Sequence, residues 1–503
     1  MPDDQSEVIA FLADPATHGG AAVARVDTHS AHVVLAGDTA LKIKRAVRYD
    51  YLDFSTLSKR RAVLERELAL NAGAAPSIYR DVVAITREAD GSLALGGRGE
   101  PVEFVLRMNR FPAEAQLDRV AGAGRLDDDL ARALGAAVAQ YHAAAAPRDA
   151  DGAELIREIL AELSRVFDGM EADLGAEAIR AFAEGAGSLH ARLAPLLARR
   201  SREGHVRRCH SDLHLANIVL LDGRPVPFDA LEFDERLGTC DTGYDIAFLL
   251  MDLHQRDLKS QANQCLNAWL AETGDVEALD CLPLFLAVRA AIRAMVAVQT
   301  ARATERQVPA AARDYLALAT GFLHPAPPQL VAVGGLSGTG KTTVARRLAP
   351  LLPPVPGAVH LRSDEVRKAL LHADPLDRLP EAGYAEAVTA AVYDRLETAA
   401  RACLAAGQSV VLDATFLDAD RRRAVRALAR ETGCAAAFVW LTAPPETLVA
   451  RVAARRGDAS DADAAVVRAQ LGRDPGPIDW TVIEALGDAE ILARTVQDML
   501  PPA

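Results

Sequence analysis

The stretch LVAVGGLSGTGKTT, residues 330–343, joins an apolar strand pattern to the glycine-rich pattern GxxxxGK followed by Thr, and it runs into the helix pattern TTVARRLA. Backbone N–H groups of such a turn and the N-terminus of the following helix bind phosphate groups. Lys341 is expected to reach the β- and γ-phosphate oxygens as a catalytic residue, and Thr342 to offer its hydroxyl to Mg²⁺. The stretch therefore predicts a P-loop that binds ATP with Mg²⁺. The residues predicted to contact the nucleotide are Gly335, Leu336, Ser337, Gly338, Thr339, Gly340, Lys341, Thr342 and Thr343.

Strand and helix patterns alternate from this stretch to the C-terminus. The strand patterns AVHLRSD, SVVLDAT and AAFVWLTA are separated by helix patterns near residues 383–406 and 419–432. This order is typical of a parallel sheet covered by helices on both faces, with ligands at the carboxyl ends of the strands. We expect an α/β P-loop domain over residues 330–503.

The strand pattern after the P-loop ends in LRSDEVRKAL, which places Asp364 and Arg367 at the rim of the predicted sheet. Asp364 would take the proton from an acceptor hydroxyl, and Arg367 would hold an anionic group. Asp364 would also serve as the N-cap of the helix EVRKALL. Both roles stay open at this point.

Asp413 ends the apolar strand pattern SVVLDAT. A carboxylate in this position orients the Mg²⁺ shell in P-loop proteins. The alternative is an aspartate that lies in a turn at the end of a strand.

Three arginines, Arg451, Arg455 and Arg456, occupy the end of a later helix pattern and the loop after it. We expect a mobile lid that brings Arg451 and Arg455 over the γ-phosphate. A solvated basic helix face is the alternative.

Together, GLSGTGKTT, LRSDEVRKAL, SVVLDATF and RVAARRGDASDA resemble the P-loop kinase group that includes polynucleotide kinase, zeta toxins and gluconate kinase. The resemblance implies that Asp364 is the base that activates the acceptor. It implies transfer of phosphate to a hydroxyl group and leaves the acceptor open.

The segment LHPAPPQ, residues 323–329, contains three prolines, which exclude a continuous helix. We place a linker there. Before it, the strand patterns AHVVLAG, TALKIK, DVVAIT and VEFVLRM surround one helix pattern at residues 55–72, and residues 127–322 are mostly helical apart from a strand-and-loop segment at 206–234. We expect an α+β domain with two lobes over residues 1–322.

The loop CHSDLHLANIVLL, residues 209–221, contains Asp212 and Asn217, and Asp229 follows on the next strand pattern. Phosphoryl transfer by the protein-kinase plan requires such a set, a base and two Mg²⁺ ligands. The loop resembles the aminoglycoside phosphotransferase and choline kinase branch. That resemblance implies that Asp212 is the catalytic base, that Asn217 and Asp229 bind Mg²⁺, that His210 and His214 order the loop, and that Asp245 anchors it.

The strand pattern TALKIK places Ala40, Lys42 and Lys44 on one face. Ala40 and Lys42 match the Val-Ala-Ile-Lys spacing of kinases, so Lys42 is our phosphate ligand, with Lys44 as the alternative. Lysine is scarce in this chain, which favours a role for the few that are present, although a solvated strand lysine is the competing interpretation. Glu67 is the expected ion-pair partner of Lys42, and Glu65 is the alternative.

Two departures from the phosphotransferase pattern stand out. Ser211 occupies a position that is usually glycine, and the strand turn near residues 28–31 has no glycine-rich loop to cover phosphates. The second departure leaves open a degenerate nucleotide-binding or sensor domain.

Composition narrows the function further. Net charge is −13, which disfavours nucleic acid as a partner, and the six cysteines form no CxxC pair. The first residues lack the pattern of a signal peptide, and Pro283, Arg289 and Arg293 interrupt the most apolar helix pattern, so we expect a cytoplasmic protein without a membrane span.

We therefore expect an ATP-dependent kinase that acts on a hydroxyl of a small molecule, with two Mg·ATP sites. The alternatives are an ATP-hydrolysing regulatory protein with a degenerate sensor domain, and a kinase for nucleic-acid or nucleotide 5′-hydroxyls. Protein partners are left unknown.

Overall fold

The computed structural model describes residues 4–28, 30–49, 52–374, 376–454 and 457–501. The chain packs as two compact units, Met1–Ile156 with Ala194–Asp252, and Arg157–Leu193 with Leu253–Ala503. The proline-rich segment at 323–329 lies within the second unit, between α11 (Ala311–Phe322) and β13 (Gln329–Gly335). The division into domains over 1–322 and 330–503 stays a prediction.

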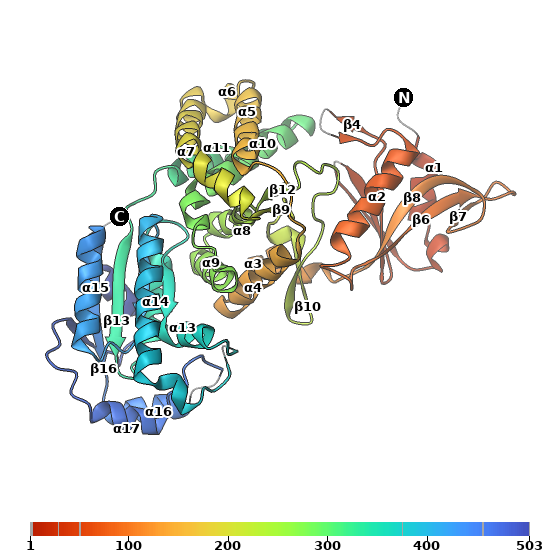
Figure 1. Cartoon of the computed structure of the whole chain (residues 1–503). Helices are drawn as coiled ribbons and strands as arrows, with labels where there is room; N and C mark the ends of the chain where they lie inside the picture. Colours follow the sequence, from red (N-terminus) through yellow and green to blue (C-terminus); the bar gives the residue numbers. More distant parts are fainter. Residues whose placement is uncertain (1–3, 29, 50–51, 375, 455–456, 502–503) are drawn as a thin grey trace. The chain divides into compact units, whose positions relative to one another are not determined.

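The first unit contains an antiparallel sheet of six strands (Figure 1). The strands, in spatial order, are β1 (Val23–Asp27), β2 (Ala31–Ala36), β3 (Thr39–Lys44), β8 (Glu100–Asn109), β6 (Tyr79–Arg87) and β7 (Leu93–Leu95). Because side chains alternate along β3, Leu41 and Ile43 pack into the core that includes α1 (Ser6–Ala13), while Lys42 and Lys44 point toward α2 (Leu57–Asn71).

Short strands and helices hold the predicted catalytic loop in the same unit. The loop leaves β9 (Val206–Arg208), passes through the 3₁₀ turn η3 (Leu215–Asn217) and enters the hairpin of β10 (Ile218–Leu221) and β11 (Arg224–Pro227). Strand β12 (Thr239–Asp241) pairs with β9 and leads into α8 (Thr242–Gln255). Two helices of this unit, α3 (Leu117–Gly122) and α4 (Asp128–Ala144), precede the loop in the chain. The strand-and-loop segment expected at 206–234 is therefore present.

Further helices lie between residue 152 and the linker. They are α5 (Gly152–Phe167), α6 (Glu171–Leu174), α7 (Ala176–Arg202), α9 (Lys259–Thr273), α10 (Ala278–Ala303) and α11. Within the described part of the chain, α10 is long and apolar enough to cross a membrane, with a mean hydropathy of 1.9, although 67% of that window is buried inside the protein. Pro283, Arg289 and Arg293 therefore do not make α10 too polar to pass as a membrane span by this measure, contrary to the expectation from the sequence. Its burial is that of a helix in a protein core.

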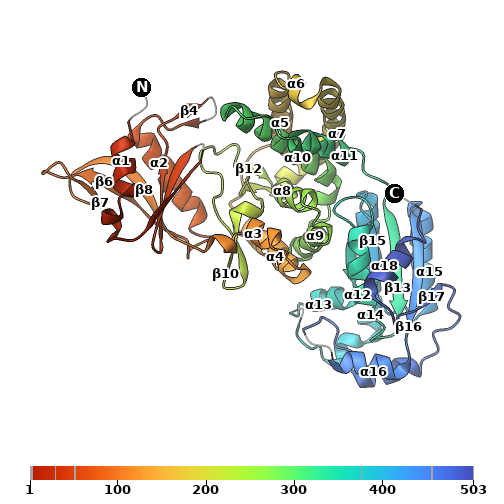
Figure 2. The same ribbon diagram turned by 180° about the vertical axis from the view of Figure 1, so that it is seen from behind.

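The second unit contains a parallel sheet in the order β14 (Val359–Arg362), β15 (Val410–Asp413), β13, β16 (Ala435–Thr442) and β17 (Thr481–Glu484). Helices α14 (Glu386–Ala405) and α15 (Ala419–Thr432) cover one face, and α12 (Lys341–Leu348) and α18 (Ala489–Gln497) cover the other (Figures 1 and 2). The expected α/β P-loop fold is confirmed. Strand β17 and helix α18 lie beyond the strand and helix patterns from which the fold was predicted.

The edge strand β14 is covered by a helix from the preceding part of the chain. Asn263 and Asn267, one turn apart on α9, donate from Nδ2 to Ala358 O at 2.9 and 3.1 Å. His360 N donates to Asn267 Oδ1 at 2.7 Å. Side-chain amides thus satisfy backbone groups at an edge that no other strand of the described residues pairs.

Candidate active sites

The P-loop connects β13 to α12 through glycines in left-handed backbone conformations. Gly335, Gly338 and Gly340 have φ of 136°, 87° and 91°. A Cβ on Gly338 would lie 2.6 Å from Leu448 O, and a Cβ on Gly335 would lie 2.4 Å from Leu441 O. The glycines are therefore required both by conformation and by the close approach of β16 and of α16 (Pro445–Ala454).

Thr342 of the P-loop and Asp413 at the end of β15, the two predicted Mg²⁺ ligands, meet directly. Thr342 Oγ1 donates to Asp413 Oδ2 at 2.6 Å, and Lys341 Nζ donates to Leu336 O at 2.9 Å. Burial raises the pKa of Asp413, but the hydrogen bond from His360 and the charges of Arg362 and Lys341 outweigh this effect, so its pKa lies well below 3.8. An ionised carboxylate beside a hydroxyl is an oxygen donor set that suits Mg²⁺.

Asp364 lies in the first turn of α13 (Ser363–Leu370) and is not its N-cap, a position that Arg362 occupies. Burial raises the pKa of Asp364, an effect that Asp413 reinforces and that Arg362, Lys341 and a hydrogen bond with Ser460 partly oppose. Asp364 is thus close enough to the P-loop groups to feel their charge. A carboxylate with a raised pKa is a better proton acceptor than an ordinary aspartate, as the predicted base role requires.

Arg367 is buried one turn after Asp364, with 7% of its surface exposed. Its Nη1 donates to Gly383 O at 2.9 Å and to Thr389 Oγ1 at 3.2 Å, and its guanidinium lies 4.9 Å from the ring centroid of Tyr384. Its Nε has no hydrogen-bond partner among the described residues. The anion-binding role of Arg367 stays a prediction.

Arg451 contacts the P-loop itself. Its Nη1 donates to Gly338 O at 3.4 Å and to Thr339 O at 3.3 Å, and its Nη2 donates to Ala485 O at 2.9 Å. The alternative of a solvated basic face therefore does not hold for Arg451. Arg455 and Arg456 lie outside the described residues, so the lid stays a prediction for them.

Sequence reasoning missed several groups that hold this site. Gln470 on α17 (Ala464–Leu471) accepts from Ser337 N at 2.8 Å, and Arg362 pairs with Asp458 at 3.1 Å. His360 Nε2 lies 3.3 Å from Asp413 Oδ2. A strand that ends in His-Leu-Arg beside the strand that ends in Asp413 was the one available signal, because the carboxyl ends of neighbouring parallel strands meet.

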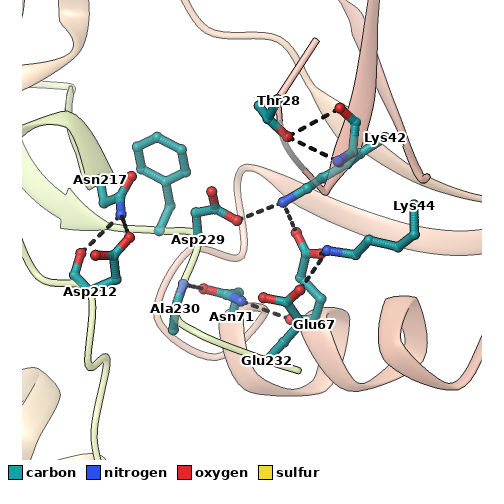
Figure 3. Close-up of polar contacts among 12 residues, drawn as sticks. Thr28, Lys42, Lys44, Glu67, Asn71, Asp212, Asn217, Asp229, Ala230 and Glu232 are labelled. Atoms are coloured by element: carbon teal, nitrogen blue, oxygen red, sulfur yellow. Dashed lines mark hydrogen bonds and ion pairs between the residues drawn. The ribbon is translucent and has the colours of Figure 1, made fainter. Parts of the chain in front are cut away.

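In the first unit, Lys42 lies between two carboxylates (Figure 3). Its Nζ donates to Glu67 Oε1 and to Asp229 Oδ1, both at 2.7 Å. Burial lowers the pKa of Lys42, but the carboxylates of Asp229, Glu67 and Glu232 raise it well above 10.5. Glu65 instead pairs with Arg61 at 2.8 Å on the exposed face of α2. The expected lysine–glutamate pair is therefore between Lys42 and Glu67.

The predicted catalytic loop is assembled around Asp212 and Asn217 (Figure 3). Asn217 Nδ2 donates to Asp212 Oδ2 at 2.8 Å and to Asp212 O at 2.9 Å. Asp245, which is completely buried, accepts from His210 N at 3.1 Å and from Ser211 N at 2.7 Å. Asp245 thus anchors the loop as expected.

The serine that replaces the usual glycine has a φ of 65°, which is the left-handed conformation that glycine favours. Ser211 adopts it because its N–H is held by Asp245. The substitution changes side-chain chemistry and leaves the loop conformation in place.

Three more residues position Asp229, and sequence reasoning missed them. Tyr79 Oη accepts from Asp229 N at 3.0 Å. Asn71 Oδ1 accepts from Ala230 N at 2.9 Å (Figure 3). Glu232 accepts from Lys44 Nζ at 2.6 Å. Asn71 lies one helical turn after Glu67, and Glu232 lies three residues after Asp229. Such spacings are too common in sequences to identify either residue as part of a site.

Comparison with known proteins matches two separate stretches of the chain to protein families. Residues 61–282 match the phosphotransferase enzyme family, and residues 330–475 match an AAA domain family. An uncharacterized protein of Mycobacterium tuberculosis is 32% identical over 482 residues, which cover 93% of each chain.

Two further relatives each cover one part. A ribose 1,5-bisphosphate phosphokinase of Methylobacterium radiotolerans is 34% identical over 174 residues, which are 34% of this chain and 96% of the relative. A solved choline/ethanolamine kinase family protein from Mesorhizobium loti is 17% identical with a TM-score of 0.41, and the match covers 64% of this chain and 95% of that one.

Proposed function

Because this chain belongs to the same family as the uncharacterized mycobacterial protein, a family that joins a phosphotransferase region to a P-loop kinase region, we propose that it is an ATP-dependent kinase for a hydroxyl group of a small molecule. The P-loop site is the main catalyst in this proposal. The observation that carries it is the meeting of Thr342 and Asp413 at 2.6 Å, with Lys341 and Asp364 electrostatically close to them.

The residues divide the work of phosphoryl transfer. Bound Mg·ATP supplies the phosphoryl group and the metal that neutralises its charge. Lys341 and the P-loop N–H groups hold the phosphates, Thr342 and Asp413 hold the metal, and Asp364 accepts the proton of the acceptor hydroxyl. Arg367 binds an anionic group of the acceptor, and Arg451 keeps the P-loop in shape through its carbonyls.

The acceptor proposal has three supports. The Methylobacterium relative is by name a kinase for a phosphorylated sugar, which agrees with a buried arginine near the base. A net charge of −13 favours a small acceptor over nucleic acid. We therefore propose a small molecule, rather than nucleic acid, as the acceptor.

The N-terminal site is proposed as a second Mg·ATP site, with Asp212 as base and Asn217 and Asp229 as metal ligands. Its oxygen donors fit Mg²⁺, and its Lys42–Glu67 pair is formed. One observation favours a second candidate, a sensor that binds ATP weakly. Strand β1 ends at Asp27 and β2 begins at Ala31, so the connection contains no glycine-rich loop that would cover phosphates.

The test is turnover of γ-labelled ATP by the wild type and by Lys341→Ala and Asp212→Ala, with a metabolite extract as acceptor and products separated by mass. Loss of labelled product in Lys341→Ala alone supports the P-loop site as the kinase. Loss in Asp212→Ala alone assigns the chemistry to the N-terminal site. ATP hydrolysis without any labelled product refutes the kinase proposal in favour of a regulatory ATPase.

A further inference from the structure

A second lysine completes the charged cluster around Glu67 (Figure 3). Lys44 Nζ lies 2.6 Å from Glu67 Oε2 and 2.6 Å from Glu232 Oε1. Glu67 therefore has one ammonium group on each of its two oxygens, Lys42 on Oε1 and Lys44 on Oε2. The cluster contains two lysines and three carboxylates when Asp229 is included.

The two lysines differ in their access to a ligand. The Lys42 side chain is 12% exposed, and its partner Asp229 is 39% exposed. The Lys44 side chain is 1% exposed, and its partners Glu67 and Glu232 are 0% and 8% exposed. A phosphate group can thus replace Asp229 at Lys42, whereas Lys44 is enclosed by protein.

Both lysine pairs join the same two segments. Lys42 and Lys44 lie on β3, while Asp229 and Glu232 lie three residues apart in the segment after β11. Binding of phosphate by Lys42 and of metal by Asp229 would break the 2.7 Å contact between them. The buried Lys44–Glu232 pair would then be the ion pair that still joins the segments.

The positive charge of Lys44 affects how easily Lys42 can leave its carboxylate partners for a phosphate group. Carboxylate oxygens of Glu67, Asp229 and Glu232 lie within 4.8 Å of one another. Without Lys44, Lys42 would be the one ammonium group that the described residues place among these three carboxylates, and it would be held there more strongly. Its transfer to a phosphate would then be less favourable.

We propose that Lys44 and Glu232 are positioning residues of the N-terminal nucleotide site, which keep Glu67, β3 and the Asp229 segment in place while Lys42 and Asp229 exchange their mutual contact for Mg·ATP. This proposal rests on the proposed function, because it requires Mg·ATP at this site. It assigns Lys42 as the phosphate ligand and gives Lys44 a separate task.

The test uses the full-length Lys341→Ala chain, in which the P-loop lysine is removed, and measures Mg·ATP binding by calorimetry with and without Asp229→Asn, which alters a proposed metal ligand and so identifies the N-terminal site. Lys44→Met is expected to weaken this binding about 10- to 100-fold, as for other residues that orient ligand-binding groups. Lys59→Met is the matched control, because Lys59 is 47% exposed on α2, and its affinity should equal that of the parent.

A double variant separates positioning from simple charge balance. Lys44→Met leaves Glu232 buried without its partner, and Lys44→Met/Glu232→Gln removes that charge, so the double variant should recover part of the lost thermal stability. Affinity that stays at least about tenfold weak in this stable double variant supports positioning. Affinity that returns to the parent value overturns it.

The parent chain distinguishes this inference from the function on which it rests. If Lys341→Ala protein binds no Mg·ATP that Asp229→Asn weakens, the second site itself is refuted, and the inference with it. If the parent binds and Lys44→Met binds equally well, the inference alone is overturned.

Discussion

Replacing Asp245 is expected to release the catalytic loop of the first unit. The carboxylate is completely buried and accepts from His210 N at 3.1 Å and Ser211 N at 2.7 Å, and His142 Nε2 lies 3.1 Å from Oδ2. Hydrogen bonds to a charged group contribute about 1.5–3 kcal/mol each. Because removal of one partner from a buried charged set usually costs about 3–5 kcal/mol, we expect this cost for Asp245→Ala. Asp245→Asn keeps one acceptor oxygen and should cost less.

The assay must report on the first unit alone. The three tryptophans, Trp269, Trp440 and Trp480, all lie in the second unit, so their fluorescence does not report on the loop. Hydrogen exchange of peptides that cover residues 209–217 reports on it directly. A loss of about 3–5 kcal/mol corresponds to roughly 10²- to 10⁴-fold faster exchange in that loop.

Two results would refute this reasoning. Exchange in residues 209–217 that changes by less than about tenfold would mean that Asp245 does not anchor the loop. A loss of unfolding free energy in the tryptophan-detected transition that equals the loss measured by exchange in the loop would mean that the variant destabilises the second unit too. The expected tryptophan transition equals that of the wild type.

Three further predictions concern the P-loop site. Gly338→Ala should weaken Mg·ATP binding in calorimetry and destabilise the second unit by about 1–3 kcal/mol. The reason is that Gly338 has a φ of 87° and that the new Cβ would lie 2.6 Å from Leu448 O. Unchanged Mg·ATP binding would contradict this prediction. Thr342→Val should lower Lys341-dependent turnover about 10- to 100-fold and raise the Mg²⁺ concentration that turnover requires, because the hydroxyl beside Asp413 is lost. Thr342→Ser keeps the hydroxyl and is the active control. Coinciding Mg²⁺ titrations of Thr342→Val and the wild type would refute the role of Thr342 as a metal ligand. Burial raises the pKa of Asp364, so turnover should fall on acidification from a pH above 3.8, and a pH profile of kcat whose acidic limb lies at or below 3.8 would count against Asp364 as base.

Residues whose roles follow from local spacing could be predicted from sequence. The P-loop glycines, Thr342 and Asp413 lie in motifs that combine a strand end with a turn, and the structure brings Thr342 to Asp413. Lys42 followed from alternation on one strand, and Glu67 from a helix that faces it. In each case the geometry of one or two elements determines the contact.

Residues that act through register between distant elements could not be predicted. Gln470 reaches Ser337 because α17 folds back over the P-loop, and no motif records that return. Glu232 pairs with Lys44 across 188 residues of sequence, and a glutamate after a metal ligand is unremarkable until the fold places it. The hydropathy of α10 did not reveal that it is a core helix, because its burial depends on the elements that pack around it.

The asparagines of α9 change where a shortened form of this protein should begin. A fragment that starts at the proline-rich segment would contain every P-loop motif but would lose Asn263 and Asn267. The backbone of β14 would then be an uncovered sheet edge, which readily pairs with the same strand of another copy. A P-loop fragment intended to stay monomeric should therefore retain α9, upstream of the boundary that the sequence alone indicates.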